Sequence, residues 1–215
     1  MNKRLFILVI TLICFSCGTD MDDKLTVSPP SDFHYLGGLP IPFYTHGDSD
    51  LPSINWGNEV GLFSLNALYT GISVNSSTGI ISWNENLPLG ENTIQVNATN
   101  SVGTAIATVL AYHQFGGHFN GGYNMDPNST VVSLANLNIT FNVDGTMSIT
   151  DSGNTVMGTW SFVAEKLICH YTLASVNYEL VFDLTYSVTV NPLLEGFKRI
   201  EGNTSNIGFA RLNYI

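Results

Sequence analysis

The C-terminal half of the chain alternates between apolar and polar residues over many short segments. Leu137, Ile139, Phe141 and Val143 are apolar, and the residues between them are polar. Strict alternation of this kind is typical of a strand that buries one face. The pattern predicts eight strands, at 118–124, 137–143, 146–151, 156–163, 167–174, 178–189, 194–201 and 207–214.

Short turn signals separate these strands. Asp144-Gly145 is the dipeptide preferred in a tight type I′ hairpin, and Ser152-Gly153 and Asn191-Pro192 are expected as further turns. Short connections make consecutive strands antiparallel neighbours. Eight such strands most simply close into an up-and-down barrel, because closure removes the unpaired edges of an open sheet.

Aromatic residues recur on the expected inward face of this barrel. A barrel of eight strands is either filled by side chains or holds one small ligand. An aromatic lining can stack on a sugar or enclose a small apolar molecule, whereas a packed core would use the same rings for stability. The expected inward set is Phe141, Trp160, Phe162, Tyr171, Phe182 and Tyr186, and all but Phe162 are taken as candidate ligand-binding residues.

The N-terminal half carries shorter β signals. Ile94, Val96 and Ala98 fall on one face of the segment 93–99, and polar residues fall on the other, which predicts a half-buried strand. The segment 71–83, the turn 87–90 and the corner 98–103 (Ala-Thr-Asn-Ser-Val-Gly) together resemble the Ig-like family of bacterial surface proteins, which is related to cadherin-like sandwiches.

That resemblance implies an N-terminal β-sandwich over 33–113. Cadherin-like relatives hold calcium between domains with acidic clusters, which makes Asp48, Asp50 and Glu59 the candidates here. Calcium prefers several clustered oxygen ligands with carboxylates among them. We therefore expect no metal site, and keep calcium as the alternative.

The C-terminal module also resembles a known family. Residues 139–146 (Ile-Thr-Phe-Asn-Val-Asp-Gly-Thr), followed by 158–162 (Gly-Thr-Trp-Ser-Phe), are similar to lipocalin-like domains of Bacteroidetes lipoproteins. The resemblance implies a lipocalin-like barrel over 115–215. True lipocalins carry Gly-x-Trp on their first strand, whereas here it falls on the fourth predicted strand, so an avidin-like or other small barrel stays open. The expected fold class is therefore all-β, a sandwich followed by an eight-stranded antiparallel barrel.

Residues 1–16 have the layout of an export signal. Lys3 and Arg4 precede an apolar run over 5–15, which is shorter than the roughly 20 residues that span a bilayer. The sequence Cys14-Phe15-Ser16-Cys17 resembles a bacterial lipobox, which implies lipid attachment at Cys17. Residues 17–32 then act as anchor and flexible tether. An ordinary secretory peptide is the alternative.

Acidic residues follow Cys17 closely. This cluster resembles the surface-export signal of Bacteroidetes lipoproteins and implies an outer-membrane protein facing the cell exterior, with the periplasmic face as the alternative. Removing Lys3 and Arg4 from the 7 basic residues leaves 5 against 17 acidic ones. This balance argues against nucleic acid as a partner. The membrane is expected to be reached only through the N-terminal lipid.

Catalytic patterns are weak along the whole sequence. The five histidines show no zinc-site spacing, and no Gly-x-Ser-x-Gly elbow occurs. Cys169 shares a strand face with Leu167 and Tyr171 while His170 lies on the other face, which predicts a buried structural cysteine. The remaining acid–base candidates are read as solvated carboxylates on the outer face: Glu165, Glu179, Asp183, Glu195 and Glu201.

These observations predict a membrane-anchored, non-enzymatic lipoprotein of the cell envelope that binds an extracellular ligand, either a carbohydrate or a small apolar molecule. One alternative is a structural or adhesive surface module whose barrel is packed and has no small-molecule site. A hydrolase of unknown substrate is the other alternative.

Overall fold

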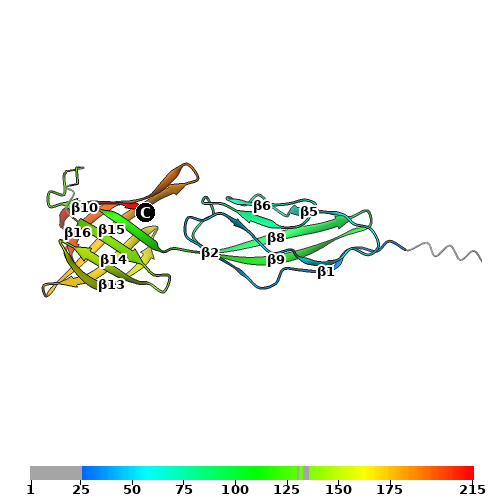
Figure 1. Cartoon of the computed structure of the whole chain (residues 1–215), viewed down its shortest axis with the longest axis horizontal. Helices are drawn as coiled ribbons and strands as arrows, with labels where there is room; N and C mark the ends of the chain where they lie inside the picture. The colour runs from blue at the N-terminus through cyan, green and yellow to red at the C-terminus, as the bar shows by residue number, and fades with distance from the viewer. Residues whose placement is uncertain (1–25, 130, 133–135) are drawn as a thin grey trace, which may run out of the picture.

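The computed structural model describes residues 26–129, 131–132 and 136–215. The predicted signal peptide, Cys17 and most of the tether lie outside these residues. Figure 1 shows two β bodies that lie end to end, with the chain entering through the first and finishing in the second. The described residues contain no helix long and apolar enough to cross a membrane.

The first body contains nine short to medium strands. Its long hairpin, β8 and β9, supplies six of the eleven buried residues of the sandwich core. The expected inward positions Ile94, Val96 and Ala98 are fully buried. The strands are β1 Ser31–His34, β2 Leu39–Pro42, β3 Gly47–Asp48, β4 Ser53–Asn55, β5 Leu62–Leu65, β6 Ile72–Val74, β7 Ile81–Trp83, β8 Gly90–Asn100 and β9 Gly103–Gln114.

Two sheets of this body face each other. One has the order β2-β9-β8-β5 and the other β3-β7-β6, while β1 and β4 form a separate pair. Ile81 from the second sheet belongs to the same buried cluster as Ile94 and Val109 from the first. Burying such side chains contributes about 1.5–3 kcal/mol each, so this shared layer holds the sandwich together.

The fold begins slightly earlier than the tether boundary suggested. β1 starts at Ser31, and the backbone N–H of Ser28 donates a hydrogen bond of 2.8 Å to the carbonyl of Gly57. Asn100 donates from its amide to the carbonyls of Ser28 (2.7 Å) and Trp56 (3.1 Å). The end of the predicted tether is therefore part of the sandwich.

The second body is a closed barrel of eight antiparallel strands, as predicted. Each strand pairs with the next along the chain, and β10 pairs with β17 to close the ring. The strands are β10 Gly117–Asn124, β11 Asn136–Phe141, β12 Thr146–Asp151, β13 Asn154–Val163, β14 Lys166–Leu173, β15 Val176–Ser187, β16 Val190–Ile200 and β17 Asn206–Tyr214.

One predicted turn was wrong. Asn191-Pro192 lies inside β16, and the chain reverses at residues 188–189 instead. Proline lacks the N–H that a regular ladder requires. It is tolerated here because the pairing of β15 with β16 shifts register between Thr185 and Ser187, opposite this segment.

The other two hairpins lie where they were predicted, but their geometries differ. Ser152 and Gly153 both have positive φ (50° and 84°), as a type I′ turn requires. At Asp144-Gly145 only Gly145 has positive φ (85°), and Gly145 N–H donates to the Asn142 carbonyl at 3.2 Å. This reversal is therefore a longer turn that ends in a left-handed glycine, and the type I′ assignment was wrong.

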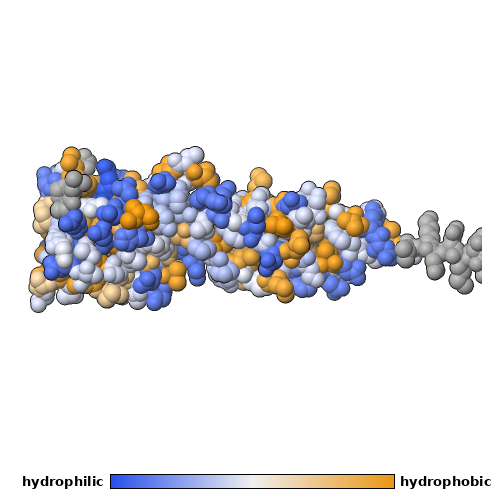
Figure 2. Space-filling model, in the orientation of Figure 1, coloured by the Kyte–Doolittle hydropathy of each residue, from blue (hydrophilic) through white to orange (hydrophobic). Residues whose placement is uncertain are grey.

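The barrel interior is filled by side chains. Phe119, Ile139, Ile149, Leu180 and Phe182 have no solvent exposure and pack in one continuous cluster. On the face shown in Figure 2, exposed apolar residues of both bodies are scattered among hydrophilic ones.

Candidate functional site

The end of the barrel that faces the sandwich is closed by a residue of the sandwich. Phe43 directly follows β2 and is only 4% exposed, because its ring lies in the core cluster of the barrel. Its ring centroid lies 5.0 Å from Phe115, 5.4 Å from Tyr186 and 5.6 Å from Tyr214. The two bodies therefore share a core at this point.

Hydrogen bonds between the two bodies surround Phe43. The Tyr44 hydroxyl donates to the Ser187 carbonyl at 3.2 Å, and the Val188 N–H donates to Asn86 Oδ1 at 3.2 Å. Tyr44 holds a left-handed backbone conformation (φ 52°), which turns the chain sharply after Phe43. These contacts fix the position of the sandwich loop against the barrel.

His113 is buried at the same junction. Its Nδ1 lies 2.7 Å from the Leu87 carbonyl oxygen, and its ring stacks on Phe43 at 6.0 Å. Burial lowers the pKa of His113 below its usual value, although the hydrogen bonds to the Leu87 and Pro88 carbonyls oppose this change. A neutral imidazole is therefore favoured between the two bodies.

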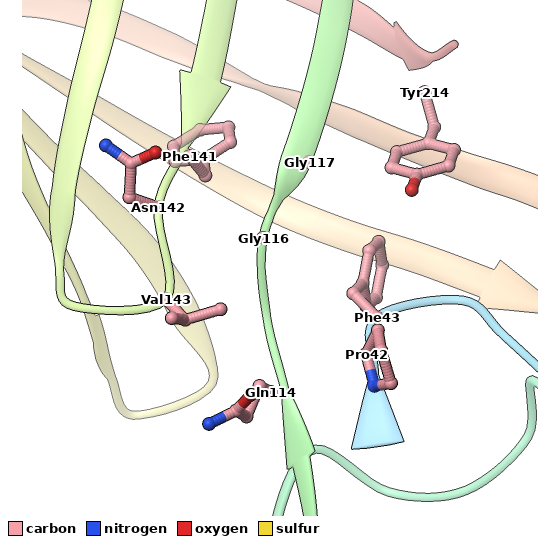
Figure 3. Close-up of a pocket in the computed structure, with 9 residues that line it drawn as sticks. All are labelled: Pro42, Phe43, Gln114, Gly116, Gly117, Phe141, Asn142, Val143 and Tyr214. Carbon is pink, nitrogen blue, oxygen red and sulfur yellow. The ribbon is translucent and has the colours of Figure 1, made fainter. Parts of the chain in front are cut away.

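A cleft of about 460 Å³ opens beside this junction. Figure 3 shows that the linker between β9 and β10 runs through it, with Pro42, Phe43 and Tyr214 on one side and Asn142 and Val143 on the other. Gln114, Gly116, Gly117 and Phe141 complete the lining. Sandwich, linker and barrel all contribute to it.

A polar cluster occupies the other end of the barrel. Lys198 Nζ lies 2.5 Å from Asp151 Oδ2, and the Tyr171 hydroxyl donates to the same oxygen at 2.7 Å. The ammonium group also lies 4.4 Å from the ring centroids of Tyr123 and Tyr178. Lys198 is 4% exposed and Asp151 is fully buried, so this ion pair belongs to the interior.

The surroundings of Asp151 favour its charged form. Burial alone would raise the pKa of this carboxyl, but hydrogen bonds from Lys198 and Tyr171, together with the positive charge of Lys198, lower it below the usual value. Burial and the neighbouring carboxylate raise the pKa of Tyr171, which keeps its hydroxyl protonated as a donor. The ion pair between Lys198 and Asp151 therefore has hydrogen-bonding partners inside the barrel.

The candidate ligand-binding residues are distributed along the barrel rather than gathered in one cavity. Phe182 is fully buried in the core, and Tyr171 lies in the polar cluster. Trp160 donates from Nε1 to the Asn142 carbonyl at 2.9 Å, and Tyr186 packs on Phe43. Among the five, Phe141 alone lines the junction cleft.

Phe162 shares the inward face but lies at the rim. It is 38% exposed and packs against Phe115 at 5.2 Å and Trp160 at 6.0 Å. The rings of Phe115, Trp160 and Phe162 therefore pack against one another at this rim.

Two important residues were missed by the sequence interpretation. Lys198 follows Leu194 and Gly196 at period two, so the alternation itself placed it inward. Its charge concealed that signal, because lysines are rarely buried without a partner. Phe43 carries no comparable signal, since its burial depends on the second body.

Four of the five acid–base candidates lie beside a basic side chain. Glu179, Asp183 and Glu195 form ion pairs with Arg199, Lys166 and Arg211 on the outer wall. Glu201 lies 3.2 Å from Nδ1 of His170, whereas Glu165 stands in the exposed turn after β13.

Cys169 is fully buried, as predicted, and burial raises the pKa of its thiol. In the sandwich, Asp48 accepts a hydrogen bond of 2.5 Å from Ser82, and Glu59 accepts one from Ser101. Within the described ranges, no group of three or more His, Cys, Asp or Glu side chains is arranged to hold a metal ion.

Comparison with known proteins assigns no family to this chain. No family model matches it, and no curated protein sequence matches it.

Proposed function

We propose that this chain is a lipid-anchored, non-enzymatic protein of the cell envelope that acts as a stiff two-domain binding arm with a solid barrel. Its ligand contacts then lie on the outside of the two bodies. The observation that carries this proposal is the filled barrel interior, which Phe43 closes at one end and the Lys198–Asp151 pair at the other.

A filled interior favours the packed-barrel alternative over a ligand held inside. A molecule entering the barrel would have to displace fully buried side chains such as Phe119 and Phe182. Protein interiors are packed as densely as organic crystals, so this displacement is costly. The proposal therefore keeps the binding role and moves it to surfaces outside the barrel.

The finer identities belong to the same proposal. The two facing sheets support an Ig-like sandwich, and the closed up-and-down order supports a lipocalin-like barrel. The lipid anchor rests on the sequence around Cys17 and on the apolar leader before it. The ion pairs of Glu179, Asp183 and Glu195 support a non-enzymatic role, because each of these carboxylates is paired with a lysine or an arginine.

A dye-binding experiment tests the solid barrel. The mature chain is titrated with 1-anilinonaphthalene-8-sulfonate, beside Phe43→Ala and, as a matched control in the sandwich core, Phe33→Ala. We expect no stoichiometric binding to the wild type, binding after Phe43→Ala opens the barrel, and much less after Phe33→Ala. One dye molecule bound per wild-type barrel would refute the solid-barrel proposal.

The anchor has a separate test. The full chain and its Cys17→Ser variant are expressed in a bacterium that processes lipoproteins, with radiolabelled palmitate in the medium. We expect label and membrane association for the wild type and neither for Cys17→Ser. Equal labelling of both chains would remove Cys17 as the attachment site.

A further inference from the structure

The cleft at the domain junction has the size and the position of a small-molecule site. Its volume of about 460 Å³ lies within the roughly 300–1,000 Å³ usual for such sites, which occur preferentially between domains. The sandwich supplies Pro42 and Phe43, and the barrel supplies Phe141–Val143 and Tyr214. Because the contacts around Phe43 hold the two bodies together, the cleft is largely formed before any ligand arrives.

The lining of the cleft carries no charged side chain. Its nine residues include no Asp, Glu, Lys, Arg or His, although the chain as a whole has a formal charge of -10. A charged ligand entering here would lose hydration without gaining a counter-charge. The cleft therefore selects for a neutral molecule.

Three polar groups of the lining are available to such a molecule. Within the described part of the chain, the Gln114 side chain and the Tyr214 hydroxyl form no hydrogen bond, and Asn142 uses its Nδ2 for Thr146 (2.9 Å), which leaves Oδ1. Amide and phenol groups both donate and accept. This pairing capacity matches sugar hydroxyls, which also do both, whereas a purely apolar ligand would leave these groups unpaired.

Apolar surface lies next to these polar groups. Pro42 and Val143 are exposed at the two sides of the cleft, and the Tyr214 ring lies across the linker. Aliphatic and aromatic surfaces of this kind pack against the C–H faces of a pyranose ring. Gly117 permits this arrangement, because a Cβ there would lie 2.5 Å from the Tyr214 ring and its φ is +114°.

From this geometry we infer that the junction cleft binds a neutral saccharide. The inference rests on the proposed binding function and gives it a location and a ligand class. Both bodies contribute residues to the proposed site, because Pro42 and Gln114 belong to sandwich strands and Tyr214 to the last barrel strand.

Titration followed by amide NMR shifts of the mature chain tests this inference. The probes are glucose, galactose, mannose, N-acetylglucosamine, cellobiose and chitobiose, with glucuronate as the charged analogue of glucose. We expect at least one neutral sugar to shift the Gly116 and Gly117 amides saturably, with a millimolar Kd, and glucuronate to bind at least about tenfold more weakly.

Two variants locate the binding. Val143→Trp fills the cleft from a side chain that is 62% exposed, and we expect it to abolish the shifts. Val163→Trp adds the same bulk at a position 58% exposed on the same end of the barrel but outside the cleft, and it should bind as the wild type does. Gln114→Ala should weaken binding about fivefold or more.

Either of two results would overturn the inference: no sugar of the panel shifting these amides at about 50 mM, or Val143→Trp binding as tightly as Val163→Trp. If the sugars fail while the wild-type barrel still excludes the dye, the proposed arm stands and its ligand binds elsewhere. If the wild-type barrel takes up the dye, the proposed function fails whatever the sugars do.

Discussion

The sandwich and the barrel have very different charge patterns. Residues 26–114 contain no lysine or arginine, whereas 115–215 contain four, and each of these four forms an ion pair with a carboxylate. The sandwich instead satisfies its polar backbone with asparagine and serine side chains, as where Asn100 binds the carbonyls of Ser28 and Trp56. The two neighbouring β bodies therefore differ in their use of lysine and arginine ion pairs.

The barrel itself contains two kinds of ion pair. Lys166–Asp183, Arg199–Glu179 and Arg211–Glu195 lie on the outer wall, and Lys198–Asp151 lies inside. Exposed pairs contribute little because water screens them, whereas a buried charge without its partner is strongly destabilising. The burial of each ion pair should therefore determine how much the pair contributes to the free energy of unfolding.

The largest expected effect comes from breaking the internal pair. Lys198→Met leaves Asp151 charged and buried, and should lower the free energy of unfolding of the barrel by about 3–5 kcal/mol. Amide hydrogen exchange, read separately over β1–β9 and β10–β17, measures the loss in each body. The double variant Lys198→Met with Asp151→Leu should recover at least half of the loss, and a double variant as unstable as the single one would contradict this explanation.

The next effect tests whether the two bodies share a core. Phe43→Ala removes a sandwich residue, yet it should lower the protection of barrel amides by about 3 kcal/mol, because the ring fills a space in the barrel core. Phe33→Ala, in the core of the sandwich, is the matched control and should act mainly on β1–β9. Loss of protection confined to the sandwich after Phe43→Ala would show that the barrel does not depend on this ring.

The fold was predictable where local pattern determines it. Period-two alternation located all eight barrel strands and, with the short turns, their antiparallel order. The pattern failed at Asn191-Pro192, because the register shift that lets Pro192 enter a strand depends on the partner strand β15. Composition alone therefore could not distinguish this segment from a turn.

The candidate site was much less predictable than the fold. Alternation correctly placed Phe141, Tyr171 and Phe182 inside, but it carries no information on whether inward rings leave a cavity. Whether a cavity remains depends on Phe43. Its ring packs on the ring of Phe119, although Phe43 lies more than seventy residues earlier in the chain. The junction cleft likewise combines three distant segments, so no local motif could indicate it.

A smaller effect is expected from pH at the junction. Burial lowers the pKa of His113 below 6.5, so the unfolded chain binds a proton here more readily than the folded chain does. The contribution of the neutral His113 to stability is therefore fully present above about pH 6.5. It is lost progressively as the pH drops from there toward the lowered pKa of the folded state. Between about pH 7.5 and pH 5, urea unfolding should show that the free energy of unfolding falls more in the wild type than in His113→Gln. Equal losses in both chains would assign the pH dependence to other groups.

The smallest effect is expected at the outer wall, where Lys166→Met is the matched partner of Lys198→Met. Both variants remove one lysine charge from an ion pair of the same barrel, but Lys166 and Asp183 are largely exposed. Water solvates Asp183 once its partner is gone, so the loss should stay below about 0.5 kcal/mol and shrink further in salt. Amide hydrogen exchange over β10–β17 measures this loss, which can then be compared directly with the loss in Lys198→Met. A loss as large as that of Lys198→Met would mean that the outer ion pairs stabilise the barrel, and the absence of basic residues from residues 26–114 would then mark the sandwich as the weaker body.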